Sequence, residues 1–256
     1  MTEEVKKEAA YNMRKNERRV AVIAGTPVDT QMGVEFINKK VSEEIKEAAA
    51  SADRTDSSEE AAYEVLQPVY CPVSENCDAQ VRFQYSDEAG KRARIDEIFD
   101  PEIAKGTKDF FIYCNSLSGA FDFDSYAEEK CVNIYTPLQI YRKLGGQFGR
   151  VGVIAANNIS AHGIEKALLS ANDDIYVIGS GNMSIVRAIE RAHAPAEIIK
   201  ECGLEYMVRY METCGAEAMI LGCTHFPYIK GEFEKICSIP VIDPADMMYA
   251  ALVSPC

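Results

Sequence analysis

One apolar hexapeptide occurs twice in this chain, and the repeat is the strongest constraint on the fold. Residues 19–24 read RVAVIA and residues 150–155 read RVGVIA. Short apolar runs rich in β-branched residues predict buried strands. Self-similarity at this distance predicts a duplicated supersecondary unit, with each copy opening a lobe of its own. We therefore expect two similar α/β lobes.

Two cysteines stand where later apolar runs end. The run at 110–113 reads FFIY and stops at Cys114, and the run at 219–222 reads MILG and stops at Cys223. In an open α/β sheet, ligands bind beyond the carboxyl ends of the parallel strands. A helix that begins there would favour the thiolate form of each cysteine. The pattern predicts two thiols that approach one ligand from opposite lobes.

The predicted architecture is α/β, with two pseudo-symmetric lobes, each a mainly parallel sheet flanked by helices, and the active site in the cleft between them. Residues 1–116 form the first lobe, to which 228–256 return, and residues 117–227 form the second. Further predicted elements are a loosely attached charged helix at 1–18, a solvated loop at 51–60, strands at 65–69, 175–178 and 240–244, and one long helix at 195–213.

Composition excludes several classes of protein. The chain has 256 residues and a formal net charge of −13, which disfavours a surface that binds nucleic-acid phosphates. It contains no apolar stretch near the roughly 18 residues of a membrane span, and its N-terminus lacks the apolar core of a signal peptide. We expect a cytoplasmic protein. The nine cysteines include no C-x-x-C pair and only three histidines are present, so we expect neither a disulfide framework nor a metal site.

The two cysteine motifs resemble those of a known enzyme superfamily. Residues 221–227 read LGCTHFP, similar to the second thiol motif of glutamate racemases, and residues 114–116 read CNS, similar to the first. The chain therefore resembles the aspartate/glutamate racemase superfamily, and the likeness spans most of residues 19–250. The resemblance implies a racemase that uses no cofactor and acts on an acidic or related amino acid as its small-molecule substrate.

The resemblance also implies roles for particular residues. One of the two thiols, Cys114 or Cys223, would remove the α-proton as thiolate, and the other would protonate the opposite face of the planar intermediate. A histidine beside a thiol can stabilise the thiolate, so His225 would assist Cys223. Three further residues would bind the amino and carboxylate groups of the substrate: Asn115, Ser116 and Thr224.

Other positions depart from the glutamate racemase pattern. Ala24 stands where those enzymes carry an aspartate, and the turn that Gly25 and Thr26 begin is more similar to aspartate racemases. We place Gly25 and Thr26 among the substrate-binding residues. Asp29 either supplies the missing carboxylate or caps its own turn. Asn157 replaces a threonine-rich turn, and it either contacts a substrate carboxylate or caps the next helix.

The sequence leaves the substrate open. Aspartate or glutamate is favoured, and a hydantoin racemase or a maleate isomerase is the alternative within the superfamily. A decarboxylase is disfavoured because such members need only one thiol. A different class also remains, a catalytically silent protein that binds small anionic metabolites in the same cleft. The oligomeric state is open as well, with a homodimer as one option.

Overall fold

Two parallel sheets of four strands each organise the chain. The computed structural model describes residues 16–52 and 64–254. The sheet orders are β2-β1-β3-β4 and β6-β5-β7-β8, so the two lobes share one topology and the predicted architecture is confirmed. The strands are β1 (Asn16–Ala24), β2 (Glu64–Pro72), β3 (Asp109–Ile112), β4 (Asn133–Tyr135), β5 (Arg150–Ala155), β6 (Tyr176–Gly181), β7 (Ala218–Gly222) and β8 (Val241–Ile242).

The repeated hexapeptide forms an inner strand of each sheet, β1 in the first and β5 in the second. In the first sheet Ile23 of β1 lies opposite Ile112 of β3. In the second, Ala155 of β5 lies opposite Gly222 of β7. Both pairs are parallel, so β3 and β7 end at the edge where their neighbours end. The sequence duplication therefore brings the segments after β3 and β7 to equivalent places in the two lobes.

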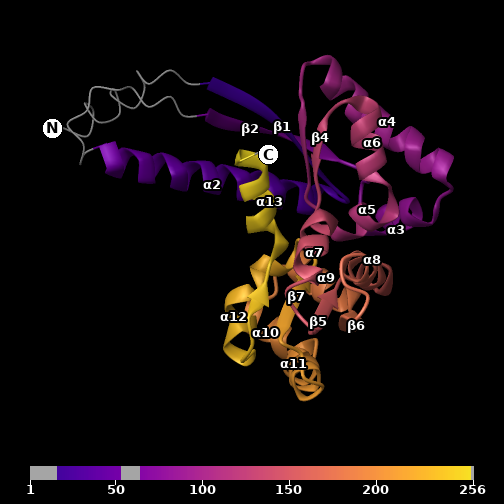
Figure 1. Cartoon of the computed structure of the whole chain (residues 1–256), viewed down its shortest axis with the longest axis vertical. Helices are drawn as coiled ribbons and strands as arrows, with labels where there is room; N and C mark the ends of the chain where they lie inside the picture. Colours follow the sequence, from indigo (N-terminus) through magenta and orange to yellow (C-terminus); the bar gives the residue numbers. More distant parts are fainter. Residues whose placement is uncertain (1–15, 53–63, 255–256) are drawn as a thin grey trace.

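Helices flank both sheets, and α2 projects from the body of the first lobe (Figure 1). The helical elements are α2 (Pro27–Ala52), α3 (Cys77–Tyr85), α4 (Glu88–Ala104), α5 (Asn115–Ala120), α6 (Phe123–Lys130), α7 (Pro137–Gly145), α8 (Asn158–Leu169), α9 (Met183–Glu190), α10 (Pro195–Glu201), α11 (Leu204–Thr213), the 3₁₀ turn η1 (Phe226–Tyr228), α12 (Lys230–Ile236) and α13 (Pro244–Val253). No helix within the described ranges is long and apolar enough to cross a membrane.

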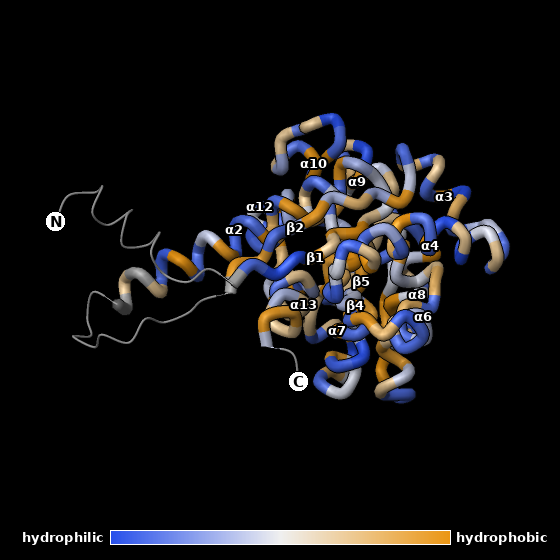
Figure 2. The backbone as a smooth tube through the Cα atoms, turned by 90° about the horizontal axis from the view of Figure 1, so that it is seen from above, coloured by the Kyte–Doolittle hydropathy of each residue, from blue (hydrophilic) through white to orange (hydrophobic). Residues whose placement is uncertain are grey.

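The inner strands carry the core, and apolar colouring follows them in Figure 2. Residues 20–24 are fully buried. Phe99 of α4 stacks on Phe110 of β3 with ring centroids 4.3 Å apart, and each fully buried aromatic ring contributes about 2–3 kcal/mol. In the second lobe Met219 and Leu221 of β7 pack among the helices that follow. The strand ends that carry the cysteines are thus held by buried side chains.

The sheets divide the chain differently from the expected lobe boundaries in two places. The short strand β4 pairs with β3 in the first sheet, although it lies within 117–227. The two-residue strand β8 pairs with β7 in the second sheet, although it lies within 228–256. Within 228–254, α13 returns toward the first lobe, where it contacts α7 and β4. The strand expected at 240–244 contains β8, but strands of two or three residues give too short a pattern for their sheet to be assigned from sequence.

Two local predictions were wrong. The helix expected over 195–213 is two helices, α10 and α11, because Gly203 adopts a left-handed backbone (φ 65°) between them. Residues 16–18, expected in a charged helix, extend β1 instead. The rest of that predicted helix, residues 1–15, lies outside the described residues. So does most of the loop expected at 51–60, whose first two residues end α2.

Candidate active site

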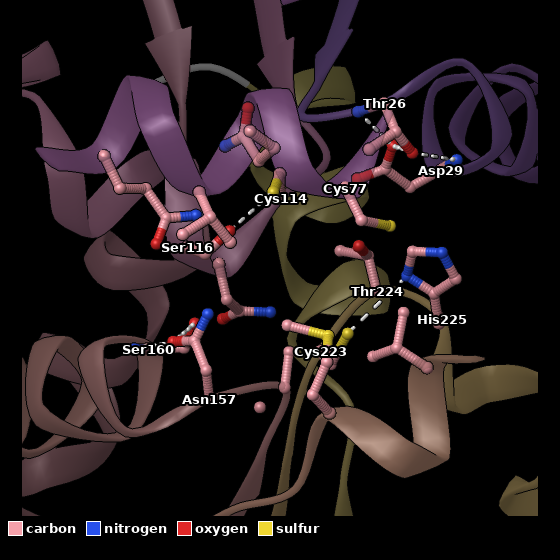
Figure 3. A pocket seen from close by; sticks show the side chains of 18 residues that line it. Thr26, Asp29, Cys77, Cys114, Ser116, Asn157, Ser160, Cys223, Thr224 and His225 are labelled. Carbon is pink, nitrogen blue, oxygen red and sulfur yellow. Dashed lines mark hydrogen bonds between the residues drawn. The ribbon is translucent and has the colours of Figure 1, made fainter. Parts of the chain in front are cut away.

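Cys114 and Cys223 lie on opposite sides of one small cavity between the lobes (Figure 3). Cys114 follows β3 and is the residue before α5, and Cys223 directly follows β7. Both side chains are buried. The cavity has an empty volume of about 470 Å³, which includes space that is open to solvent. The structure brings the two strand-end cysteines together at one site, as the sequence predicted.

Cys114 is held as a neutral thiol by its surroundings. Burial, and secondarily the negative charge of Asp29, raises the pKa of Cys114 to about 12. Its Sγ lies 3.3 Å from the Oγ of Ser116. The sequence suggested that a helix N-terminus would favour the thiolate at this position. At Cys114 desolvation outweighs that effect, because α5 is only six residues long and the thiol is buried.

Cys223 stands beside a buried cation. Its Sγ lies 3.6 Å from Nδ1 of His225, and Nε2 of the same ring lies 3.4 Å from the Glu190 carboxylate of α9. Burial alone lowers the pKa of His225, but the contacts with Cys223 and Glu190 outweigh it and raise that pKa to about 10. His225 is therefore an imidazolium at neutral pH. An imidazolium at this distance stabilises negative charge on the Cys223 sulfur.

Asp29 both caps a turn and faces the cavity. Its Oδ1 accepts from the backbone N–H and the hydroxyl of Thr26, each at 2.6 Å, and its Oδ2 accepts from the N–H of Gly25 at 3.2 Å. Burial raises the pKa of Asp29, while the charge of His225 lowers it. The turn cap considered for Asp29 from the sequence is present, and its assistance to Cys114 stays a prediction. Thr26 also lines the cavity, whereas Gly25 is not among the lining residues.

The remaining predicted residues all line the cavity: Asn115, Ser116, Asn157 and Thr224. Asn115 is oriented by Tyr141, whose hydroxyl donates to Oδ1 at 2.7 Å. Asn157 caps α8, because its Oδ1 accepts from the backbone N–H of Ser160 at 2.8 Å and from the Ser160 hydroxyl at 3.0 Å. The acceptor of Asn157 is therefore already occupied. Its capping role was one of the two alternatives that the sequence left open.

Several lining residues gave no recognisable signal in the sequence. Four come from α3: Cys77, Gln80, Val81 and Gln84. The Sγ of Cys77 lies 3.1 and 3.3 Å from the two carboxylate oxygens of Glu190, so a hydrogen bond crosses the cleft from α3 to α9. Gln80 and Gln84 are four residues apart, a helical spacing that places both on one face. That spacing was the only available hint, because the helix itself was not predicted.

The charge of the cavity wall comes from few groups. No lysine or arginine is among the residues that line it, and the lining imidazole of His225 is already paired with a carboxylate. Among residues 16–52 and 64–254, no group of three or more His, Cys, Asp and Glu side chains is placed to hold a metal ion. The wall offers thiols, hydroxyls and amides. These groups can exchange a proton with a bound molecule and hydrogen-bond it.

The fold and the paired thiols define a known family. The model of the Asp/Glu/Hydantoin racemase family matches residues 38–252, so the chain belongs to this family. Among curated relatives, the chain is 26% identical over 165 residues to a glutamate racemase of Acidothermus cellulolyticus, which covers 61% of this chain and 62% of that protein. It is 33% identical over 102 residues to a glutamate racemase of Limosilactobacillus reuteri, 38% of each chain.

Solved structures share the fold over nearly the whole chain. A Francisella tularensis glutamate racemase, crystallised in complex with D-glutamate, aligns with a TM-score of 0.60 and 19% identity over 92% of this chain and 81% of that one. A Picrophilus torridus aspartate racemase aligns with a TM-score of 0.56 and 14% identity over 92% of this chain and 93% of that one. By contrast, the sequence alignments with the first curated relatives span only about half to three fifths of their length.

Proposed function

We propose that the protein is an amino-acid racemase that works without a cofactor, by proton transfer between two thiols. The observation that carries the proposal is the pair of buried cysteines, Cys114 and Cys223, which equivalent strands of the two lobes deliver to one cavity. General acid and base groups on opposite faces of a planar intermediate are what inversion at Cα requires. Membership of the racemase family supports the same activity.

The electrostatics suggest which thiol is the base in the resting enzyme. The imidazolium of His225 lies 3.6 Å from the Cys223 sulfur, whereas burial raises the pKa of Cys114. In one direction Cys223 Sγ takes the Cα proton, and the electron pair of the broken C–H bond remains on the substrate as a carbanion. Cys114 then gives its proton to the opposite face. The enantiomer leaves behind a Cys114 thiolate and a Cys223 thiol, and the reverse reaction starts from that state.

Substrate binding falls to the neutral polar groups around the thiols. Asn115, Ser116 and Thr224 would bind the amino and carboxylate groups, with Thr26 on the side of Asp29. We propose an acidic amino acid, aspartate or glutamate, or a close relative of these, since the curated relatives are named glutamate racemases. The cytoplasmic location and the option of a homodimer stay predictions.

The test is α-proton exchange in D₂O by the purified protein, without added cofactor, using single enantiomers of a panel of amino acids. Cys114→Ser and Cys223→Ser should each lower racemisation at least about 10²-fold while the circular dichroism spectrum stays unchanged. The remaining thiol can still exchange deuterium on its own face without inversion. Near wild-type racemisation by either variant would refute the two-thiol mechanism. Ligand binding without any exchange would instead favour the silent binding protein.

A further inference from the structure

Three amide side chains in the cavity wall have a buried polar atom with no hydrogen-bond partner in the described part of the chain. The atoms are Nε2 of Gln80, Oε1 of Gln84 and Nδ2 of Asn115. Their residues are only 5%, 8% and 3% exposed. Buried polar groups in native proteins are almost always paired, so unpaired atoms of this kind that line a cavity point to a ligand.

Neighbouring groups fix what two of these amides offer. The Ser74 hydroxyl donates to Oε1 of Gln80 at 3.1 Å, which leaves Nε2 as the free donor. Tyr141 orients Asn115 in the same manner and leaves its Nδ2 free. Asn115 adjoins Cys114 and belongs to the end of the cavity where the α-carbon must lie. The α3 pair, one donor at Gln80 and one acceptor at Gln84, is left for the substrate side chain.

The charges of the wall favour an uncharged side chain. A second carboxylate on the substrate would be buried beside the carboxylate of Asp29, and no lysine or arginine lines the cavity to pair with it. The imidazolium of His225 already faces Glu190. Burying an unpaired charge is far more costly than burying a hydrogen-bonded neutral group. A carboxamide has nearly the shape of the corresponding acid, and it both accepts and donates hydrogen bonds.

We propose that Gln80 and Gln84 form a side-chain subsite that selects amino acids with a terminal carboxamide. Gln80 Nε2 donates to the carboxamide oxygen, and Gln84 Oε1 accepts from its NH₂ group. The apolar residues Val81, Met183 and Val186 line the same cavity and cover the aliphatic part of the side chain. This inference rests on the proposed racemase function and narrows its substrate to the amide relatives of the acidic amino acids.

The first experiment compares nearly isosteric pairs, glutamine with glutamate and asparagine with aspartate, by α-proton exchange in D₂O and by calorimetric binding to the full chain. We expect the carboxamide of at least one pair to show a KM and a dissociation constant at least about tenfold lower than those of its acid. Exchange that favours the acid overturns the subsite but leaves the racemase function standing. If no amino acid exchanges, the function fails, and calorimetry still decides the subsite: equal or tighter binding of the acids overturns it.

The second experiment uses two substitutions that add the same charge one helical turn apart. Gln80→Glu keeps an acceptor for Ser74 but loses the donor, so we expect the KM for the carboxamide to rise at least about tenfold. Gln84→Glu keeps an acceptor for the NH₂ group, so the KM of this variant for the carboxamide should rise much less. Gln147→Glu, on the exposed loop after α7, controls for added charge and should change neither constant. Equal effects at positions 80 and 84 would indicate a charge or folding effect and would overturn the assignment.

Discussion

The raised pKa of His225 depends in part on its contact with the Glu190 carboxylate at the end of α9. The substitution Glu190→Gln tests this dependence. Two unit charges 3.4 Å apart interact by about 5 kcal/mol at an effective dielectric constant of roughly 20. The Glu190 side chain is 23% exposed, and screening at that exposure leaves about 2–3 kcal/mol, or about two pKa units. The substitution should therefore lower the pKa of His225 from about 10 to about 8. The carboxamide that replaces the carboxylate keeps an acceptor oxygen for Cys77.

The assay is a pH titration of the histidine ring protons by NMR. The chain has only three histidines, so the signals can be assigned by single substitutions. Glu201→Gln is the matched control, because Glu201 lies 2.8 Å from His193 and is not among the groups that shift the pKa of His225. That control should leave the titration of His225 unchanged. A wild-type His225 that titrates near 6.5, or one that Glu190→Gln does not shift, refutes the reasoning.

The sign of the pH dependence follows from the direction of the shift. The folded-state pKa of His225 lies above its unfolded value, so the stability it contributes is fully present below about pH 6.5 and is lost as the pH rises through about 10. In Glu190→Gln the same loss should occur near pH 8. Racemisation that starts from the Cys223 thiolate should decline over the same interval, because the neutral imidazole no longer stabilises the sulfur anion.

Two further predictions concern the thiols. Asp29→Asn removes a charge that raises the pKa of Cys114, so in a Cys223→Ser background iodoacetamide should alkylate Cys114 faster at pH 8, and unchanged or slower alkylation would contradict this. The same substitution should lower the free energy of unfolding by about 1–3 kcal/mol, measured by urea denaturation, because an NH₂ group would face the donors of the turn. In the unsubstituted protein, iodoacetamide should abolish racemisation, and bound substrate should protect the thiols from this alkylation. Dialysis against a chelator should leave racemisation intact. Loss of activity on chelation alone would argue for a metal.

The elements that could be predicted from sequence are those with a continuous apolar run. β1, β3, β5 and β7 each carry four or more consecutive buried residues, and their parallel pairing agrees with the need of parallel strands for long, usually helical crossovers. The motifs at Cys114 and Cys223 located the cavity for the same reason, since each one begins where such a strand ends.

The residues that could not be predicted lie on short helices with weak patterns. The sequence of α3 reads CDAQVRFQY, in which polar side chains are buried because they face a cavity and not a core. Periodicity assumes that buried positions are apolar, so Gln80 and Gln84 count against a helix when they are in fact its inward face. The role of Glu190 at the end of α9 could not be predicted either, because its partner His225 is distant in sequence.

The hydrogen bond between Cys77 and Glu190 has a kinetic consequence. This bond links α3 to α9 beside the cavity that both cysteines line. A separation of the lobes that admits substrate would break the bond, and closure would re-form it. Opening and closing then compete with chemistry as the slowest step, as lid motions often do. Weakening the hydrogen bond of Cys77 would speed product release. It would also let solvent protonate the carbanion, so faster turnover would come with less control over which enantiomer forms.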